Sequence, residues 1–207
     1  DKVVDLICYC TSGLADRSPE DNKGDYINIV LRGPPGVGKT HFADIIARML
    51  YKMGIVPEKN IVRAKKTDFI GKYVGHSEHN TMEFLQCAKN SVLFIDEAYY
   101  GDGDQTDNFV KSFGDILNKF ISENRGHMVC IIAGYEDSLE RDFFSLNPGL
   151  KSRFPWIFDF KGYSQKDLFA LFEKNMRDSG WSIDEEGALI YDNFQKCRFE
   201  NYGRDIE

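Results

Sequence analysis

The sequence lacks three features: a long apolar run, a dense cluster of basic residues and a paired set of cysteines. No apolar stretch approaches the length that crosses a membrane, so a membrane partner is not expected. The Lys and Arg residues number 26 and are outnumbered by 33 Asp and Glu residues, which gives a net charge of −7. Because binding to a nucleic-acid backbone relies on clustered Lys and Arg, this balance argues against a nucleic acid as the main partner.

The cysteines are scattered and odd in number, unlike a disulfide framework. This pattern is typical of reduced thiols, so we predict a cytosol-like, reducing compartment, with the cytoplasm preferred and a plastid or another reducing compartment left open. Cys8-Tyr9-Cys10 has no second Cys or His pair nearby, which argues against a metal site. The five cysteines are Cys8, Cys10, Cys87, Cys130 and Cys197.

The length and composition are those of an ordinary globular protein. A chain of 207 residues suits one large domain, or one domain with a small appendage, and it can bury a core without disulfides or a metal. Hydrophobic residues make up 42% of the chain and charged residues 29%, which is typical of a globular domain. Local motifs must therefore indicate the function.

A glycine-rich stretch fits the phosphate-binding pattern G-x-x-x-x-G-K-[ST] at every fixed position: Gly33, Pro34, Pro35, Gly36, Val37, Gly38, Lys39 and Thr40. Glycines let successive backbone N–H groups turn toward phosphate oxygens, and the following helix N-terminus adds positive potential. Lys39 can then reach the β- and γ-phosphates, while the Thr40 hydroxyl can bind Mg²⁺. A β-branched apolar segment precedes the stretch and a helical apolar face follows it. This context favours ATP and Mg²⁺ binding over a glycine-rich turn with a chance lysine.

Two carboxylates follow a second apolar segment. Residues 92–95 are all apolar, which predicts a strand buried on both faces of a parallel sheet. Ligands of open α/β sheets bind at the carboxyl ends of the strands. Asp96 is therefore placed to hold Mg²⁺ through water, and Glu97 to orient or deprotonate a water that attacks the γ-phosphate. The alternative is a surface Asp-Glu pair, which the upstream loop at a natural spacing disfavours.

Strands and helices alternate along most of the chain. Between amphipathic helices, we predict strands at 27–31, 59–64, 92–95, 128–133 and 156–160. The alternation predicts an α/β fold with a five-stranded parallel sheet and right-handed crossovers.

The pattern changes after Gly162, where only helices are predicted. Ser164 and Asp167 form a capping box that opens the first of them. We therefore expect an N-terminal helix and loop over residues 1–25, a nucleotide-binding α/β domain over 26–161, and a small helical lid over 162–207. The lid is expected to be incomplete, because the chain ends just after Gly203 to Ile206 opens another helix.

Longer motifs resemble one family over nearly the whole chain. They are GPPGVGKT, DFIGKYVGHSEHNT, VLFIDEAYY, IIAGY, NPGLKSRF and NYGRDIE, in the order and spacing of that family. The sequence resembles a AAA+ P-loop NTPase, and within that superfamily the CbbX type. This type includes red-type Rubisco activases, the sporulation stage V protein K type and ATPases of type VII secretion. IDEAYY, and AGY followed by NPG-x-x-SRF, are far more specific than the two nucleotide motifs alone.

The resemblance implies further roles. Tyr73 matches the aromatic pore loop that grips a substrate polypeptide, although it could instead pack on the core. Arg153 matches the arginine finger that reaches a neighbour's nucleotide, although it could be a surface charge at a helix end. Arg204 matches the sensor-2 arginine of the lid, although it could simply form a salt bridge. The sensor-1 Asn of the wider superfamily is absent, and Tyr135 lies nearest its position, as in CbbX-type proteins.

The resemblance therefore implies Mg²⁺-dependent ATP hydrolysis in a homo-oligomeric ring, with a hexamer expected, coupled to the remodelling of a protein substrate. Lys39, Glu97 and Arg153 would be its catalytic residues. An arginine supplied in trans requires head-to-tail neighbours. Two alternatives stay open. A nucleic-acid motor or loader is disfavoured by the acidic balance, and a nucleotide-gated scaffold with little turnover is disfavoured by the presence of Glu97 and Arg153.

Overall fold

The chain divides into two compact units. One consists of Asp1–Arg32 and Thr40–Asp159, and the other of Gly33–Lys39 and Phe160–Glu207. The computed structural model describes residues 2–12, 25–65, 69, 76–97, 107–181, 191 and 193–206. No helix in these ranges is long and apolar enough to span a membrane. The sequence-based division at residues 25 and 161 stays a prediction.

The first unit is built on a five-stranded sheet in which every neighbouring pair of strands is parallel. Its strand order is β2-β3-β4-β1-β5, so β1 lies between β4 and β5, the last two strands along the chain. All residues of β3 and β4 are buried, as expected for strands covered on both faces. The strands are β1 (Ile29–Arg32), β2 (Ile61–Ala64), β3 (Val92–Ile95), β4 (Val129–Gly134) and β5 (Trp156–Asp159). The predicted five-stranded parallel sheet is confirmed.

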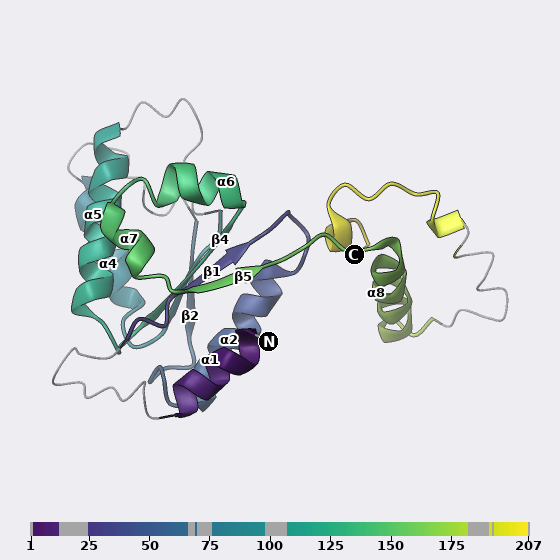
Figure 1. The fold of residues 1–207 in the computed structure, drawn as a ribbon, viewed down its shortest axis with the longest axis horizontal. Coiled ribbons are helices and arrows are strands. Elements are labelled where there is room, and N and C mark those ends of the chain that lie inside the picture. The colour runs from purple at the N-terminus through teal and green to yellow at the C-terminus, as the bar shows by residue number, and fades with distance from the viewer. Residues whose placement is uncertain are drawn as a thin grey trace. The chain divides into compact units, whose positions relative to one another are not determined.

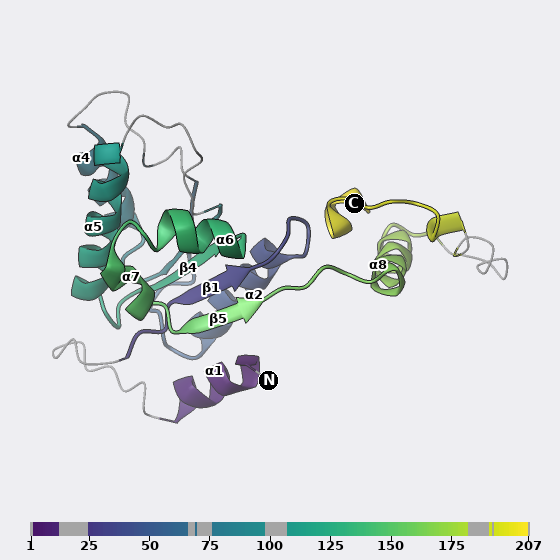
Figure 2. The same cartoon turned by 45° about the horizontal axis from the view of Figure 1, so that its top comes forward.

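Helices cover both faces of this sheet (Figures 1 and 2). α4 and α5 pack on one face, and α2 packs on the other. A short helix, α6, continues into a π-helical turn, η1, before α7 leads into β5. The helices of this unit are α1 (Lys2–Thr11), α2 (Lys39–Lys52, whose first residue belongs to the second unit), α4 (His76–Cys87), α5 (Asp107–Glu123), α6 (Glu136–Ser138), η1 (Leu139–Phe143) and α7 (Pro148–Ser152).

The core follows the twofold alternation of the strands. Val30, Leu93 and Ile132 belong to a buried cluster with residues of α4 and α5. Because successive side chains of a strand point to opposite faces, Leu31 faces the other side, together with its register partner Phe158. The Phe158 ring contacts Phe42 of α2, with 5.3 Å between the ring centroids. The sheet is therefore a buried middle layer.

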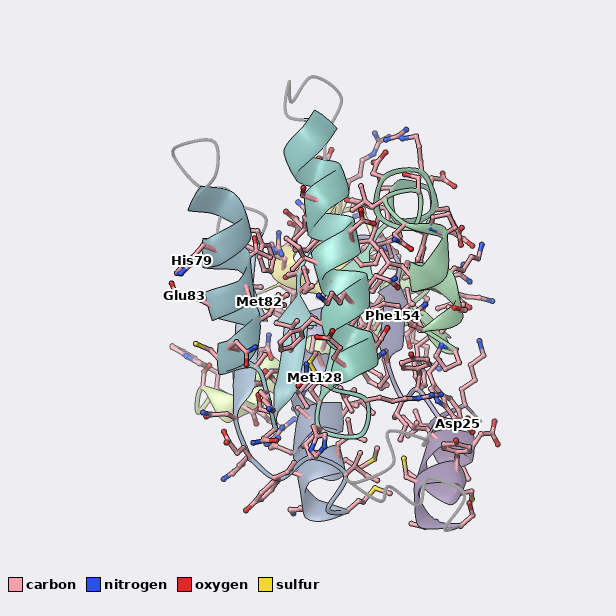
Figure 3. The ribbon with its side chains drawn as sticks, turned by 90° about the vertical axis from the view of Figure 1, so that its left-hand side faces the viewer. Asp25, His79, Met82, Glu83, Met128 and Phe154 are labelled. Carbon is pink, nitrogen blue, oxygen red and sulfur yellow. The ribbon has the colours of Figure 1, made fainter. Side chains whose placement is uncertain are left out.

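α4 has one side packed on the core and one side exposed. Met82 packs against the core cluster, whereas His79 and Glu83 lie on the exposed side with 3.6 Å between Nδ1 and a carboxylate oxygen (Figure 3). Phe69, which precedes α4, is buried with its ring centroid 4.6 Å from that of Phe113 in α5. Phe69 is thus part of the core of this unit.

α1 lies along the edge strand β5. Lys2 Nζ donates to the carbonyl oxygen of Ile157 at 2.8 Å, and the Tyr9 ring packs on Trp156 with 5.6 Å between centroids. Leu6 between them is fully buried. An open strand edge offers unpaired backbone groups to other chains, so this helix protects β5 from such pairing.

All five cysteines lie among the described residues, and none of them forms a disulfide. Cys130 is the second residue of β4 and is completely buried. Burial disfavours the charged thiolate and raises the pKa of the Cys130 thiol far above its usual range. Cys130 is therefore a protonated core residue.

The second unit contains α8 (Gln165–Asp178) and a short 3₁₀ helix, η2 (Tyr202–Asp205). Ser164 caps α8, since its Oγ accepts from the Asp167 N–H at 3.2 Å and the Asp167 carboxylate accepts from the Ser164 N–H at 3.1 Å. This confirms the predicted capping box. The ring of Phe169 in α8 packs against those of Tyr191 and Phe194, at centroid distances of 4.8 and 5.3 Å. The sequence also predicts a helix over about residues 184–197, most of which lie outside the described residues.

Candidate nucleotide-binding site

The glycine-rich loop has the backbone that its sequence predicts. Gly36 and Gly38 have φ angles of 71° and 86°, in the left-handed region that other residues rarely adopt. Lys39 Nζ donates to the carbonyl oxygens of Gly33 at 2.8 Å and Pro34 at 2.6 Å. The lysine thus folds back over the start of its own loop. A phosphate group would have to compete with these two carbonyls for the ammonium group.

The loop packs against two later segments of its own unit. The carbonyl oxygen of Gly36 accepts from the Gly203 N–H at 3.0 Å, and that of Val37 accepts from the Tyr163 hydroxyl at 3.1 Å. A Cβ added at Gly36 would lie 1.6 Å from the carbonyl oxygen of Asn201. Glycine is therefore required at position 36 for two reasons, its positive φ and the close approach of another backbone.

Arg204 lies in η2, beside this contact, and is exposed. The turn that carries it is closed by Asp205, whose carboxylate accepts from the Asn201 backbone N–H at 2.8 Å and from Asn201 Nδ2 at 3.2 Å. The backbone hydrogen bond from Asn201 is the largest cause that lowers the pKa of Asp205. The predicted sensor-2 residue is therefore held within the same unit as the loop.

Thr40 and Asp96 come together at the carboxyl edge of the sheet. Thr40 Oγ1 lies 3.5 Å from Asp96 Oδ2, which is the outer limit of a hydrogen bond. Oxygen ligands at about 2.0–2.1 Å from an octahedral Mg²⁺ are roughly 2.9 Å from one another, so the two oxygens need only a small approach to share an ion. Oxygen atoms are also the ligand type that Mg²⁺ prefers. These residues therefore fit the predicted metal.

Glu97 follows directly and has an unusual backbone. Its φ is 51°, one of three positive values at residues other than glycine in the described part of the chain. Its N–H donates to Asp96 Oδ1 at 3.1 Å, and its side chain is exposed. A left-handed conformation at such a residue costs roughly 1–2 kcal/mol and is found most often at functional sites. β3 thus ends at Ile95, and the left-handed backbone of Glu97 turns the chain out of the sheet.

Arg32 fixes the point where the chain leaves the sheet for the loop. It is the last residue of β1, and its guanidinium pairs with Asp159 at 2.7 Å and Glu136 at 2.6 Å. These carboxylates belong to the end of β5 and the start of α6. Because they are partly exposed, the pairs contribute little stability, but they hold three chain segments together at this edge.

Arg153 lies at the opposite edge of the sheet. It ends α7 three residues before Trp156, which pairs with Ile29 at the start of β1. A strand of four residues spans roughly 13 Å, so Arg153 is separated from Asp96 by about the length of the sheet. Its Nε donates to Ser122 Oγ at 2.8 Å, and its Nη1 donates to the Gly149 carbonyl oxygen at 2.6 Å. The structure therefore does not bring Arg153 together with Asp96 of the same chain.

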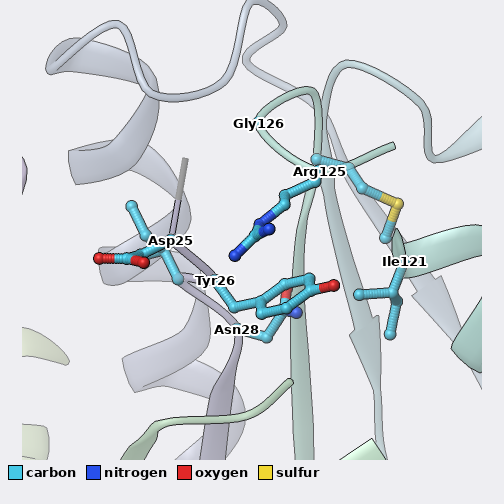
Figure 4. A pocket seen from close by; sticks show the side chains of 8 residues that line it. Asp25, Tyr26, Asn28, Ile121, Arg125 and Gly126 are labelled. Carbon is cyan, nitrogen blue, oxygen red and sulfur yellow. The ribbon is translucent and has the colours of Figure 1, made fainter. Parts of the chain in front are cut away.

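Tyr26 completes the surroundings of Arg153 at this edge. The Arg125 guanidinium stacks over the Tyr26 ring at 4.2 Å (Figure 4), and that of Arg153 lies 5.7 Å from the same ring. Such contacts stabilise a cation on an aromatic face. Asn28, which lies beside Tyr26 in Figure 4, binds the backbone of Arg153 through Nδ2 at 2.8 Å. Arg153 is thus held by its main chain and its side chain.

Tyr73 and Tyr135 are the other residues that the sequence singles out. Tyr73 lies outside the described residues. Tyr135 precedes α6 and is 43% exposed, which is compatible with its place next to the end of β4 but assigns it no role.

Three residues that the motifs do not single out also contribute contacts: Asn28, Ser122 and Tyr163. Asn28 carries a signal, because a polar residue inside an otherwise apolar strand has to find hydrogen-bond partners. Ser122 stands in an amphipathic helix and Tyr163 in a loop, where polar side chains are common. Only the folded chain shows what these two contact.

Residues 29–161 match the family described as "ATPase family associated with various cellular activities (AAA)". The match covers most of the chain and runs from the first strand past the fifth. The chain therefore belongs to the AAA family of ATPases, which confirms the predicted class and its P-loop fold.

Individual relatives place the chain in the CbbX-type group, as predicted. It is 38% identical to the cfxQ-like protein R730 of Acanthamoeba polyphaga mimivirus, over 91% of this chain and 47% of the relative. It is 34% identical to Protein CbbX of Cereibacter sphaeroides, over 84% of this chain and 54% of the relative. Stage V sporulation protein K of Bacillus subtilis is 32% identical, over 77% and 49% respectively. The chain spans about half the length of the curated relatives it matches.

Proposed function

We propose that this protein hydrolyses ATP with Mg²⁺ in a ring-shaped homo-oligomer and uses the energy to remodel a protein substrate. The observation that carries the ATPase activity is the loop Gly33–Thr40. Its glycines have left-handed backbones, its lysine is folded over it, and it joins a parallel strand to a helix. This is the arrangement in which backbone N–H groups and a helix N-terminus bind phosphates.

The roles of the loop and strand residues follow from their chemistry. Lys39 would exchange its two carbonyl partners for the β- and γ-phosphates, and the neighbouring N–H groups would bind the remaining phosphate oxygens. Thr40 and Asp96 would hold Mg²⁺, with Asp96 acting partly through water. The ion supplies positive charge that offsets the charge of the phosphates. Arg204 would contact the nucleotide from η2.

Glu97 is the proposed general base. It follows Asp96 immediately, is exposed, and is turned out of the sheet by its positive φ. A carboxylate in this position can orient a water molecule and accept its proton as the water attacks the γ-phosphate.

The two edges of the sheet support an assembly of head-to-tail neighbours. Arg153 lies about one strand length from Asp96 of its own chain, so it would serve the site of an adjacent subunit. Its two hydrogen bonds use two of the five guanidinium N–H groups. The others can meet a phosphate while Ser122 and Gly149 keep hold of the side chain. Repeated head-to-tail contacts that close produce a ring, for which we propose six subunits in a cytoplasmic setting.

The proposed substrate is a protein. The acidic composition argues against a nucleic acid, and the resemblance assigns Tyr73 to a pore loop that grips a polypeptide. Tyr73→Ala should therefore keep basal ATPase activity but abolish remodelling of a physiological partner. Loss of both ATPase activity and thermal stability would instead show that Tyr73 packs on the core.

ATP binding and turnover can be separated with two variants. Lys39→Ala should abolish tight ATP binding, because the phosphates lose their fixed cation. Glu97→Gln should still bind ATP but stop hydrolysis, because it removes the base and keeps Thr40 and Asp96 in place. Calorimetry that shows unchanged affinity in Lys39→Ala, or wild-type turnover in Glu97→Gln, would contradict these assignments.

Mixing variants tests the ring. Arg153→Ala should bind ATP normally but hydrolyse it about 10³–10⁵ times more slowly. Mixed with Lys39→Ala, which is inactive alone but retains Arg153, it should regain activity, and the recovery should grow with protein concentration. Arg125→Ala, at the same sheet edge, is the control and should retain activity without a partner. No recovery in verified mixed oligomers would show that Arg153 does not act in trans.

A further inference from the structure

We propose that Tyr163 is a positioning residue that sets the direction of the Gly38 backbone N–H in the phosphate loop. The inference rests on the proposed function, since it concerns how the same loop binds phosphates. The Tyr163 hydroxyl would do this by holding the peptide group between Val37 and Gly38.

Two consecutive carbonyl groups in the loop have external partners. Gly36 O accepts from the Gly203 N–H at 3.0 Å, and Val37 O accepts from the Tyr163 hydroxyl at 3.1 Å. Both partners belong to the same compact unit as the loop. The two hydrogen bonds therefore restrain successive peptide groups.

The geometry of the peptide bond converts these contacts into an orientation. The peptide groups of the described residues are trans, so each carbonyl points away from the N–H group of the same peptide plane. Because the Gly36 carbonyl points toward Gly203, the N–H of Val37 in the same peptide plane points away from Gly203. Because the Val37 carbonyl points toward Tyr163, the N–H of Gly38 points away from Tyr163. Both N–H groups thus face away from these contacts, where they can bind an anion.

The loop needs this restraint because of its glycines. Gly36 and Gly38 have left-handed backbones, and glycine has the largest choice of backbone conformations. Lys39 binds the carbonyls of Gly33 and Pro34, which lie at the start of the loop. The Tyr163 hydroxyl restrains the Val37–Gly38 peptide, and it can be removed without changing the backbone.

Tyr163 is itself well placed for this task. It directly precedes Ser164, the capping residue of α8, so the capping box fixes its main chain. Its ring packs edge-on against Tyr202, with 6.4 Å between centroids. Tyr202 offers a matched control, because its hydroxyl makes no hydrogen bond to another described residue.

The test measures nucleotide affinity in Tyr163→Phe and Tyr202→Phe, each made in the full chain. Fluorescent N-methylanthraniloyl derivatives of ATP and ADP are the probes, because both carry the phosphates that the loop would bind. Tyr163→Phe should weaken both by about three- to tenfold, the range expected for one lost hydrogen bond. Tyr202→Phe should leave both affinities unchanged.

Two further measurements separate positioning from stability. The melting temperature without nucleotide should be the same in Tyr163→Phe and wild type, while the rise on adding ATP should be smaller. In Tyr163→Phe, the KM for ATP should increase in parallel with the dissociation constant, while kcat should stay the same. The reason is that the loop binds the phosphates equally in the ground state and in the transition state. A residue with only a structural role would lower the melting temperature and leave affinity intact.

The outcomes distinguish this inference from the function on which it rests. Wild-type affinity in Tyr163→Phe, or an equal loss in Tyr202→Phe, would overturn the role of the Tyr163 hydroxyl while ATP binding stands. A wild-type chain that binds neither probe would overturn the proposed function, and this inference with it.

Discussion

Asn28 is a buried polar residue whose amide connects three parts of the sheet unit, so Asn28→Ala should destabilise that unit strongly. Its Oδ1 accepts from the Cys130 N–H in β4 at 2.8 Å, and its Nδ2 donates to the Arg153 carbonyl at 2.8 Å. Its exposed fraction is 2%. Alanine would leave both backbone groups without this partner.

The size of the effect follows from the burial of the two groups. The Cys130 N–H is buried, and a buried donor without a partner costs about 1–3 kcal/mol. The Arg153 carbonyl is only partly buried, so water can replace the amide and the loss is about 0.5–1.5 kcal/mol. Together these give about 2–4 kcal/mol, a large share of the 5–15 kcal/mol typical of a domain.

Urea unfolding measures this difference. The chain has two tryptophans, and a Trp181→Phe background leaves Trp156 of β5 as the only one. Selectively excited tryptophan fluorescence then reports on the sheet unit. With a typical slope of about 2 kcal/mol per molar urea, the midpoint should fall by roughly 1–2 M. Asn60→Ala is the control, because Asn60 is exposed and should change stability by less than about 0.5 kcal/mol. A change that small in Asn28→Ala would refute the reasoning.

Three further predictions concern the nucleotide site. Gly36→Ala should weaken ATP binding at least about tenfold, because the φ at this position is 71° and the added Cβ would lie 1.6 Å from the Asn201 carbonyl oxygen. The sheet should stay folded, as the fluorescence of Trp156 in urea titrations would show. Glu97→Gly should abolish hydrolysis, because the proposed base is removed. It should also raise the free energy of unfolding by about 1 kcal/mol, because glycine tolerates the φ of 51°. A lower free energy of unfolding would show that Glu97 carries no backbone strain. The Asp205 pKa is lowered in the folded chain, so its contribution to stability is complete above the usual carboxyl pKa and is lost as the pH falls through the lowered value. Asp205→Asn should remove this loss of stability at low pH, which unfolding followed by circular dichroism at several pH values would measure. An unchanged dependence of stability on pH would contradict the role of this carboxylate.

Much of the sheet could be predicted from local sequence. Four apolar residues before Asp96 indicate a strand buried on both faces, and the glycine pattern before Lys39 indicates the loop that follows another strand. These signals are local because each depends on neighbours in the chain. The capping box at Ser164 is local in the same way.

The contacts that position the site could not be predicted, because they join distant segments. Asn28 binds Cys130 only once β1 and β4 are paired in the observed register. The partner of Tyr163 is a carbonyl of Val37, which no side-chain pattern reveals. Likewise, Arg153 was recognised by its motif, but its place at the amino edge of the sheet depends on the pairing of β5 with β1.

The position of β1 also determines the order in which the sheet can form. Its partners are β4 and β5, and contacts between them join residues 102 and 127 positions apart. During synthesis, β1 and the phosphate loop are made early, but β1 can pair with no strand until β4 has left the ribosome. Pairing across such separations is slow, because long loops must close before any contact forms. The nascent chain therefore exposes an apolar strand until β4 has been made, and such transiently exposed strands are prone to aggregation.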